Sequence, residues 1–380
     1  MRTKIFFIAL ICCAIFLKVL LFWYAEKYCP QAKFQIDSAI YMESGESLVA
    51  HGQFAHHRAD GVLEPEIFRT PGYPLFLGIL HTLFGISFTG IIALQMVLSL
   101  VVGFLTYAIA NIINPRLRFL SALIVLFDLP LTVFSLMLLT ETLFLFFISA
   151  FLLVFLIYLR RPAIPLLCVA ALLTAAAAYI RPIHYFFGAA MFIFILYLSI
   201  RLRRKRLIGH AFIFLLIVYF FIGVWHMRNY NVAGINTFST MTQCAASYRE
   251  QYRDDTAITA SLPPALYYLN AVSRCVVSVM TEPGTLKEFD RGGLKFAAKV
   301  FGYLWVAFWL IGFLAGIMRL GNDHNLHFLF YVVFFFICAS VGGALFGAGY
   351  RLRVPMLVCL AIISAHGWRH LAVRSRLVKP

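Results

Sequence analysis

The chain has 380 residues, of which 62% are hydrophobic and only 13% are charged. Soluble proteins carry roughly a quarter charged residues, so this composition excludes a soluble globular protein. The net charge of +16 would suit a nucleic-acid partner, but the basic residues lie between apolar runs, where the orientation of membrane proteins explains them.

Apolar runs of about 20 residues, long enough to cross a bilayer as a helix, recur along the whole chain. The first run has no small-residue cleavage site, so we interpret it as a retained span and not as a signal peptide. The fold class predicted is an all-α polytopic membrane protein, a single membrane-embedded domain over 1–380. About ten transmembrane helices are expected, near 5–24, 87–112, 117–135, 141–159, 163–179, 184–200, 207–225, 299–318, 326–346 and 354–370.

The short loops predict the orientation. Ten basic residues fall on one side of the membrane and three on the other, so the first side is cytoplasmic and holds both termini. The predicted location is the plasma membrane, which is the inner membrane of a bacterium. All acids except Asp323 then lie on the external, periplasmic side, which is the predicted working face. Two long polar segments, 25–86 and 226–298, form external loops, each with an interfacial helix. Whether Cys244 and Cys275 form a disulfide in the second loop stays open.

The first loop concentrates acid. Six of the sixteen acidic residues fall within thirty positions: Asp37, Glu43, Glu46, Asp60, Glu64 and Glu66. Asp37 lies a short way after the first span, and Tyr41 follows it by one helical turn. Asp37 is therefore a carboxylate base at the membrane surface, the N-cap of a helix that begins at Ser38, or both.

Two further acids lie near the membrane. Glu141 stands at the external entrance of the fourth span, with Asp128 as the only other acid nearby, and is either a solvated loop acid or a buried polar group. Five arginines are predicted on the external side, suited either to phosphate binding through their bidentate forks or to contact with lipid headgroups: Arg69, Arg181, Arg228, Arg351 and Arg353.

A metal site is not predicted. His51, His56 and His57 with Asp60 match no firm ligand spacing, and structural or solvated roles explain them better. The chain has no nucleotide-binding loop and no serine-nucleophile motif. We therefore expect no required cofactor and predict no divalent metal, and whether a divalent metal assists the protein stays open.

Two motifs of the first loop together carry a family resemblance. Asp37-Ser-Ala-Ile-Tyr41 followed by Arg69-Thr-Pro-Gly-Tyr73-Pro74 resembles the first external loop of C-type, multi-spanning glycosyltransferases of the family 39 kind. That group includes dolichyl-phosphate-mannose protein mannosyltransferases and bacterial lipid A aminoarabinose transferases. The resemblance extends through Thr140-Glu141, Ile180-Arg-Pro182, Trp225-His-Met-Arg-Asn-Tyr230 and Tyr350-Arg-Leu-Arg-Val-Pro355.

The resemblance implies a hexosyl or pentosyl transferase that moves a sugar from a polyprenyl-phosphate donor to an acceptor hydroxyl, with inversion, on the external face. The implied partners are that lipid-linked sugar, a glycan, lipid or protein acceptor, and membrane lipids, without nucleic acid. The catalytic positions of the family map onto Asp37 as general base and onto Glu141 or Asp128 as the second acid. Its phosphate-binding motifs map more loosely onto Arg69, Arg181, Arg351 and Arg353. Tyr41, Tyr73 and Arg228 are further candidates for the site.

Another class of protein fits the composition. A lipid-linked-sugar flippase or a secondary transporter would also be basic and polytopic, but transporters usually show repeated halves, and this chain shows no repeat. A catalytically inactive scaffold of the same fold is a third interpretation.

Overall fold

The computed structural model describes residues 2–58, 60–241, 264–284, 294–343 and 349–374. In this part of the chain, 8 helices are long and apolar enough to cross a membrane. The predicted all-α, multi-spanning fold class is therefore confirmed, although ten spans are not. The spans are Ile5–Tyr28, Phe88–Ile113, Glu141–Arg160, Pro182–Arg201, Arg206–Ala233, Phe296–Ile317, His324–Gly342 and Gly349–Val373.

Two of the predicted spans differ from the structure. The run near 117–135 is broken into α5 (Arg118–Leu126) and α6 (Leu129–Phe134). The break has a local cause, because Asp128 caps α6 by accepting a hydrogen bond from Leu131 N at 2.9 Å, and Pro130 occupies the first turn. The run near 163–179 forms α8 (Ile164–Ile180), whose 17 residues make it shorter than each of the eight spans.

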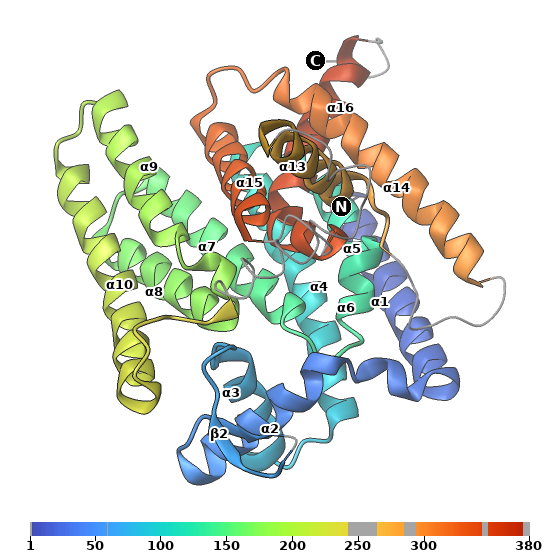
Figure 1. The fold of residues 1–380 in the computed structure, drawn as a ribbon. Helices are drawn as coiled ribbons and strands as arrows, with labels where there is room; N and C mark the ends of the chain where they lie inside the picture. Colours follow the sequence, from blue (N-terminus) through green and yellow to red (C-terminus); the bar gives the residue numbers. More distant parts are fainter. Residues whose placement is uncertain (1, 59, 242–263, 285–293, 344–348, 375–380) are drawn as a thin grey trace. The chain divides into compact units, whose positions relative to one another are not determined.

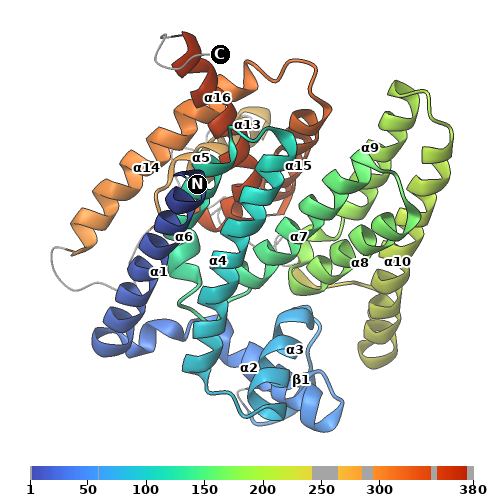
Figure 2. The ribbon, with the colours of Figure 1, turned by 180° about the vertical axis from the view of Figure 1, so that it is seen from behind.

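The chain forms two compact units, each built from segments far apart in the sequence. The first unit comprises Met1–Lys33, Ile92–Ser149 and Gln251–Pro380, and the second comprises Phe34–Ile91 and Ala150–Glu250. The single domain expected over 1–380 stays a prediction. Figures 1 and 2 show the elements of both units from opposite sides.

The first unit is a helical assembly around α16 (Leu357–Arg374), which is nearly inaccessible from Leu357 to Ile363. α14 packs along α16, where Trp368 Nε1 donates to Phe308 O at 2.9 Å. α1 packs against α5 through small and branched side chains that include Leu10 and Ala122. The other elements are α1 (Arg2–Tyr28), η1 (Pro30–Lys33), most of α4 (Phe88–Ile113), α5, α6, α13 (Pro264–Thr281), α14 (Leu294–Ile317), α15 (His324–Gly343) and the 3-10 segment η5 (Gly349–Met356).

The second unit joins a helical layer to a small loop subdomain. In the layer, α10 packs against both α8 and α9. In the subdomain, β1 and β2 form an antiparallel hairpin in which His56 pairs with Glu64. The elements are α2 (Ile36–His51), β1 (Ala55–His57), β2 (Leu63–Pro65), α3 (Gly72–Gly78), the π-helical turn η2 (Ile79–Leu83), most of α7 (Glu141–Arg160), α8, η3 (Pro182–His184), α9 (Phe187–Arg201) and α10 (Arg206–Ala233).

A close backbone contact fixes α2 against α3. A Cβ atom added to Gly45 would lie 2.2 Å from Pro74 O, and one added to Gly78 would lie 2.2 Å from Gly45 O. Only glycine allows this approach, because any side chain would push the two helices apart. The contact determines which face of α2 turns away from α3, and with it the position of Asp37.

The two helices expected in the external loops are present as α2 and α13. Both loops begin later in the chain than the predicted 25–86 and 226–298, because α1 continues to Tyr28 and α10 continues to Ala233. Cys244 lies outside the described residues, so its pairing with Cys275 stays untested.

Candidate functional site

An ion pair between Asp37 and Arg69 lies at the start of α2 in the second unit. The N-cap of α2 is Gln35, whose N–H donates to Ser38 Oγ at 2.9 Å, so the interpretation of Asp37 as the N-cap is wrong. Asp37 instead occupies the first turn, where the helix dipole favours a negative charge. Arg69 Nη2 donates to Asp37 Oδ1 at 2.7 Å, which joins the two motifs of the first loop.

Arg69 is held from its other side by Glu66, which is 1% exposed. Glu66 Oε1 accepts hydrogen bonds from the backbone N–H groups of Phe68 at 2.7 Å and of Arg69 at 2.9 Å. Glu66 Oε2 lies 3.4 Å from Arg69 Nη1 and 3.5 Å from His56 Nδ1. The Arg69 guanidinium, with 11% of the side chain exposed, therefore lies between two carboxylates.

This arrangement fixes the charge of Arg69. Burial alone would lower its pKa, but the hydrogen bond and charge of Asp37, together with the charge of Glu66, outweigh burial and raise the Arg69 pKa above its ordinary value. The Asp37 side chain is 36% exposed, and among the described residues its second oxygen, Oδ2, accepts no hydrogen bond. Asp37 thus presents one anchored oxygen and one open oxygen.

Two tyrosine rings pack beside the Asp37–Arg69 ion pair. The Arg69 guanidinium carbon lies 5.6 Å from the centre of the Tyr41 ring, within the range of a cation–π contact. Tyr41 in turn meets Tyr73 edge to face at 5.3 Å between ring centres, and both tyrosines are buried. The structure therefore groups four predicted residues, Asp37, Arg69, Tyr41 and Tyr73.

Arg181 and Arg228 lie in the same unit. A Cβ atom added to Gly72 would lie 2.7 Å from Tyr179 O, so the turn after Arg69 abuts the end of α8, where Arg181 follows. Arg228 Nη1 donates to Glu66 O at 2.7 Å, and its Nη2 donates to Phe54 O at 2.6 Å. Arg228 therefore supports the backbone that carries Glu66.

A second ion pair lies in the first unit. Arg351 Nε donates to Glu141 Oε1 at 2.6 Å, and the Glu141 side chain is fully buried. Of the two interpretations of Glu141, the buried polar group is therefore correct and the solvated loop acid is wrong. Tyr350, beside Arg351, stacks on Phe134 at 5.7 Å between ring centres.

Asp128 and Arg353 belong to a buried charge cluster in the first unit, with Lys18 as its third member. All three side chains are at most 2% exposed, and Asp128 lies within electrostatic range of both cations. Lys18 Nζ donates to Thr132 Oγ1 at 3.2 Å. Arg353 Nη1 donates to backbone carbonyls at the end of α13, one of them Glu282 O at 2.8 Å.

Sequence reasoning did not select Lys18 or Glu66. Lys18 is the only charged residue in the first apolar run, and a charge at that depth is a sufficient signal of a buried partner. Glu66 has no comparable signal, because nothing in the sequence separates it from the other acids of the first loop.

Two of the three histidines considered for a metal site, His56 and His57, have other partners. His57 Nδ1 lies 2.5 Å from Glu43 Oε1, and Arg58 pairs with Asp60. Within the described ranges, no three His, Cys, Asp or Glu side chains are placed to hold a metal ion. That the protein requires no metal stays a prediction.

Comparison with known families found no match, and no curated protein matches the sequence. Several solved structures are similar in fold. The archaeal oligosaccharyltransferase AglB from Archaeoglobus fulgidus, in complex with an inhibitory peptide and a dolichol-phosphate, matches with a TM-score of 0.60 and 11% identity over 99% of this chain and 51% of that chain. A structure of the oligosaccharyltransferase of the same organism, tethered to an acceptor peptide, matches with a TM-score of 0.60 and 11% identity over 97% of this chain and 50% of that chain.

A weaker similarity, with a TM-score of 0.44 and 13% identity, links 99% of this chain to 80% of apo ArnT from Cupriavidus metallidurans. The chain spans about half the length of AglB. The similarity to AglB shows the fold, and it confirms the prediction of a C-type, multi-spanning glycosyltransferase fold.

Proposed function

We propose that this protein transfers a sugar from a polyprenyl-phosphate donor to an acceptor hydroxyl on the external face of the membrane, with inversion. The observation that carries the proposal is the Asp37–Arg69 pair, which offers an open carboxylate oxygen beside a fixed cation. The AglB fold supports the same conclusion, because an AglB structure contains a dolichol-phosphate, a lipid phosphate of the donor's chemical class.

In the proposed reaction, the acceptor oxygen attacks the anomeric carbon of the donor sugar while Asp37 Oδ2 takes the hydroxyl proton. The bond between the anomeric carbon and the phosphate oxygen breaks, and the polyprenyl phosphate leaves with the electron pair. Attack from the face opposite the leaving group inverts the anomeric centre. No nucleotide or redox group is needed for this balance.

Arg69 would bind the leaving phosphate and stabilise its negative charge. Its guanidinium already binds a carboxylate in the geometry that also suits a phosphate oxygen. A donor phosphate in contact with Arg69 would compete with Asp37, so donor binding would release the carboxylate for its role as base. A fixed cation beside a developing negative charge contributes on the order of 100-fold or more to the rate.

Arg351 is the phosphate ligand that we propose in the first unit, and Glu141 its support. Glu141 is fully buried and bound to Arg351, a setting that favours orienting the arginine over exchanging protons with an acceptor. We propose Arg181 as a further phosphate ligand. Arg353 and Arg228 instead donate hydrogen bonds mainly to backbone carbonyls.

The test uses the full chain in lipid nanodiscs with a labelled polyprenyl-phosphate sugar and a cell-envelope extract as acceptor. Release of the lipid phosphate together with labelling of the acceptor is expected for the wild type. Asp37→Asn should abolish transfer, whereas Asp60→Asn, the same change at an exposed acid of the same loop, should leave it intact. Full activity of Asp37→Asn would refute its role as base. Movement of intact lipid across the bilayer of a liposome, without transfer, would instead identify a flippase.

A further inference from the structure

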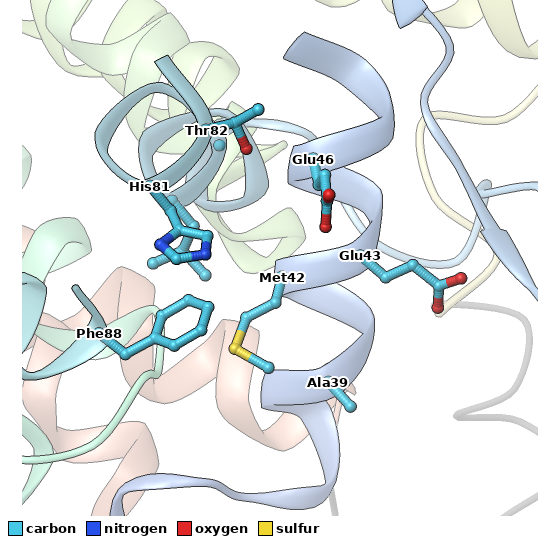
Figure 3. A pocket seen from close by; sticks show the side chains of 9 residues that line it. Ala39, Met42, Glu43, Glu46, His81, Thr82 and Phe88 are labelled. Atoms are coloured by element: carbon cyan, nitrogen blue, oxygen red, sulfur yellow. The ribbon is translucent and has the colours of Figure 1, made fainter. Parts of the chain in front are cut away.

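A pocket of about 310 Å³ lies in the second unit, between α2 and the segment formed by α3 and η2 (Figure 3). Residues on one face of a helix recur every three or four positions, so Asp37 and Tyr41 share one face of α2 while Met42 and Glu46 share the opposite face. The pocket opens on the opposite face. Its volume is near the lower end of the range of small-molecule sites, roughly 300–1,000 Å³.

The pocket has one acid available to a ligand. Glu46 lines the pocket from α2, and it makes no hydrogen bond or ion pair within the part of the chain that the structure describes. Glu43 also borders the pocket, but its carboxylate points away and lies 2.5 Å from His57 Nδ1. Of these two glutamates, Glu46 is therefore the one whose carboxylate remains available to a ligand.

The opposite wall is aromatic and polar. The rings of His81 and Phe88 stack with their centres 4.2 Å apart and face Met42 across the pocket (Figure 3). His81 Nδ1 contacts Ile86 O at 3.0 Å, which leaves Nε2 as the ring atom available to a ligand. Thr82 adds a hydroxyl group at the rim.

Among the residues that the structure describes, no lysine or arginine lines the pocket, although the chain has 32 of these residues. A phosphate or carboxylate ligand would meet only the negative charge of Glu46 there. The lining instead combines a carboxylate, a hydroxyl and an imidazole with apolar and aromatic surface. A sugar ring matches this combination, because its hydroxyls donate to a carboxylate while its C–H face packs against an aromatic ring.

We infer that this pocket is a saccharide subsite, which binds a sugar unit of the acceptor other than the one that reacts. The inference rests on the proposed function for the identity of the acceptor, but the binding of a saccharide does not. Glu46 would accept hydrogen bonds from two neighbouring hydroxyls, Thr82 would bind a third, and Phe88 with Met42 would pack against the ring.

Binding is tested on the full chain in nanodiscs by saturation-transfer NMR with methyl glucoside, methyl mannoside and methyl N-acetylglucosaminide. At least one glycoside should receive saturation, and Glu46→Gln and Thr82→Ala should each weaken its binding, the former by about tenfold, since hydrogen bonds to a charged acceptor are lost. Glu64→Gln, the same change at an exposed strand residue, should bind as the wild type does. Ethanolamine serves as a cationic probe.

Three results would overturn the inference: no saturation of any glycoside, binding that Glu46→Gln leaves unchanged, or binding of ethanolamine alone. The transfer assay separates this inference from the proposed function. If the wild type transfers sugar, the pocket variants should raise the KM for acceptors of two or more sugars while kcat and the donor KM stay unchanged. If it transfers none, the proposed function fails, and the NMR result decides the pocket by itself.

Discussion

Replacing Glu66 by Gln tests whether a buried charge positions Arg69. The substitution keeps the size of the side chain and removes its negative charge. In the structure, Glu66 accepts two backbone hydrogen bonds through Oε1 and faces Arg69 and His56 through Oε2. In the variant, an amide NH₂ group replaces one oxygen, so either the backbone donors or the guanidinium lose their acceptor.

The expected cost follows from burial. Removing one partner of a buried ion pair destabilises a protein by about 3–5 kcal/mol, because the other charge is left uncompensated. Glu66 is 1% exposed and the Arg69 side chain is 11% exposed, so both belong to that class. Arg69 keeps Asp37 as its second partner at 2.7 Å, which places the loss at the lower end, about 3 kcal/mol.

The free energy of unfolding can be measured by titrating the purified protein with SDS and following tryptophan fluorescence. Glu64→Gln is the matched control, an exposed acid two positions earlier whose neutralisation should change stability by no more than about 0.5 kcal/mol. Equal stability of the two variants would show that the Glu66 carboxylate does not stabilise Arg69, and the reasoning would be wrong.

Three further predictions concern packing and buried charge. Gly45→Ala should destabilise the protein by about 2 kcal/mol or more, because its Cβ would meet the facing α3 backbone. The control, Gly209→Ala, places its Cβ in open space and should leave stability unchanged. Equal SDS midpoints for the two variants would contradict the close contact. Arg351→Gln should cost about 3 kcal/mol by removing the cation that faces the buried Glu141 carboxylate. Adding Glu141→Gln should restore part of that loss, so a double variant less stable than the single one would exclude the coupling. Lys18→Met conserves side-chain volume but removes the cation near the buried Asp128, so it should lower the thermal unfolding midpoint of the purified protein. An unchanged midpoint would show that Lys18 does not stabilise Asp128.

The sequence predicts the fold class well because the bilayer imposes a simple rule on it. A span needs about 20 apolar residues, and the long helices follow the apolar runs closely, as in the runs near 87–112 and 141–159. The run near 117–135 has the required hydrophobicity but not a continuous helix. Its break depends on a side-chain cap at Asp128, which mean hydropathy does not detect.

The residues of the candidate site were harder to predict from the sequence than the fold class. Asp37 and Arg69 are 32 positions apart, and only the resemblance to a transferase loop connected them before the structure showed their contact. Glu66 became distinct from the other loop acids only through its burial, which depends on Arg228 and the hairpin around it. Such tertiary effects leave no periodic pattern in a single sequence.

Both arginine–carboxylate pairs follow one electrostatic logic. An arginine at the edge of a membrane is costly when it is unpaired, so each arginine that we propose as a phosphate ligand needs a partner before the phosphate arrives. Asp37 and Glu141 provide that partner in their respective units, at 2.7 and 2.6 Å. They differ in exposure, because Asp37 is partly open and Glu141 is fully buried. Only the open carboxylate can exchange its arginine for a proton donor, which is the physical reason that we propose Asp37 as the base and Glu141 as the support of Arg351.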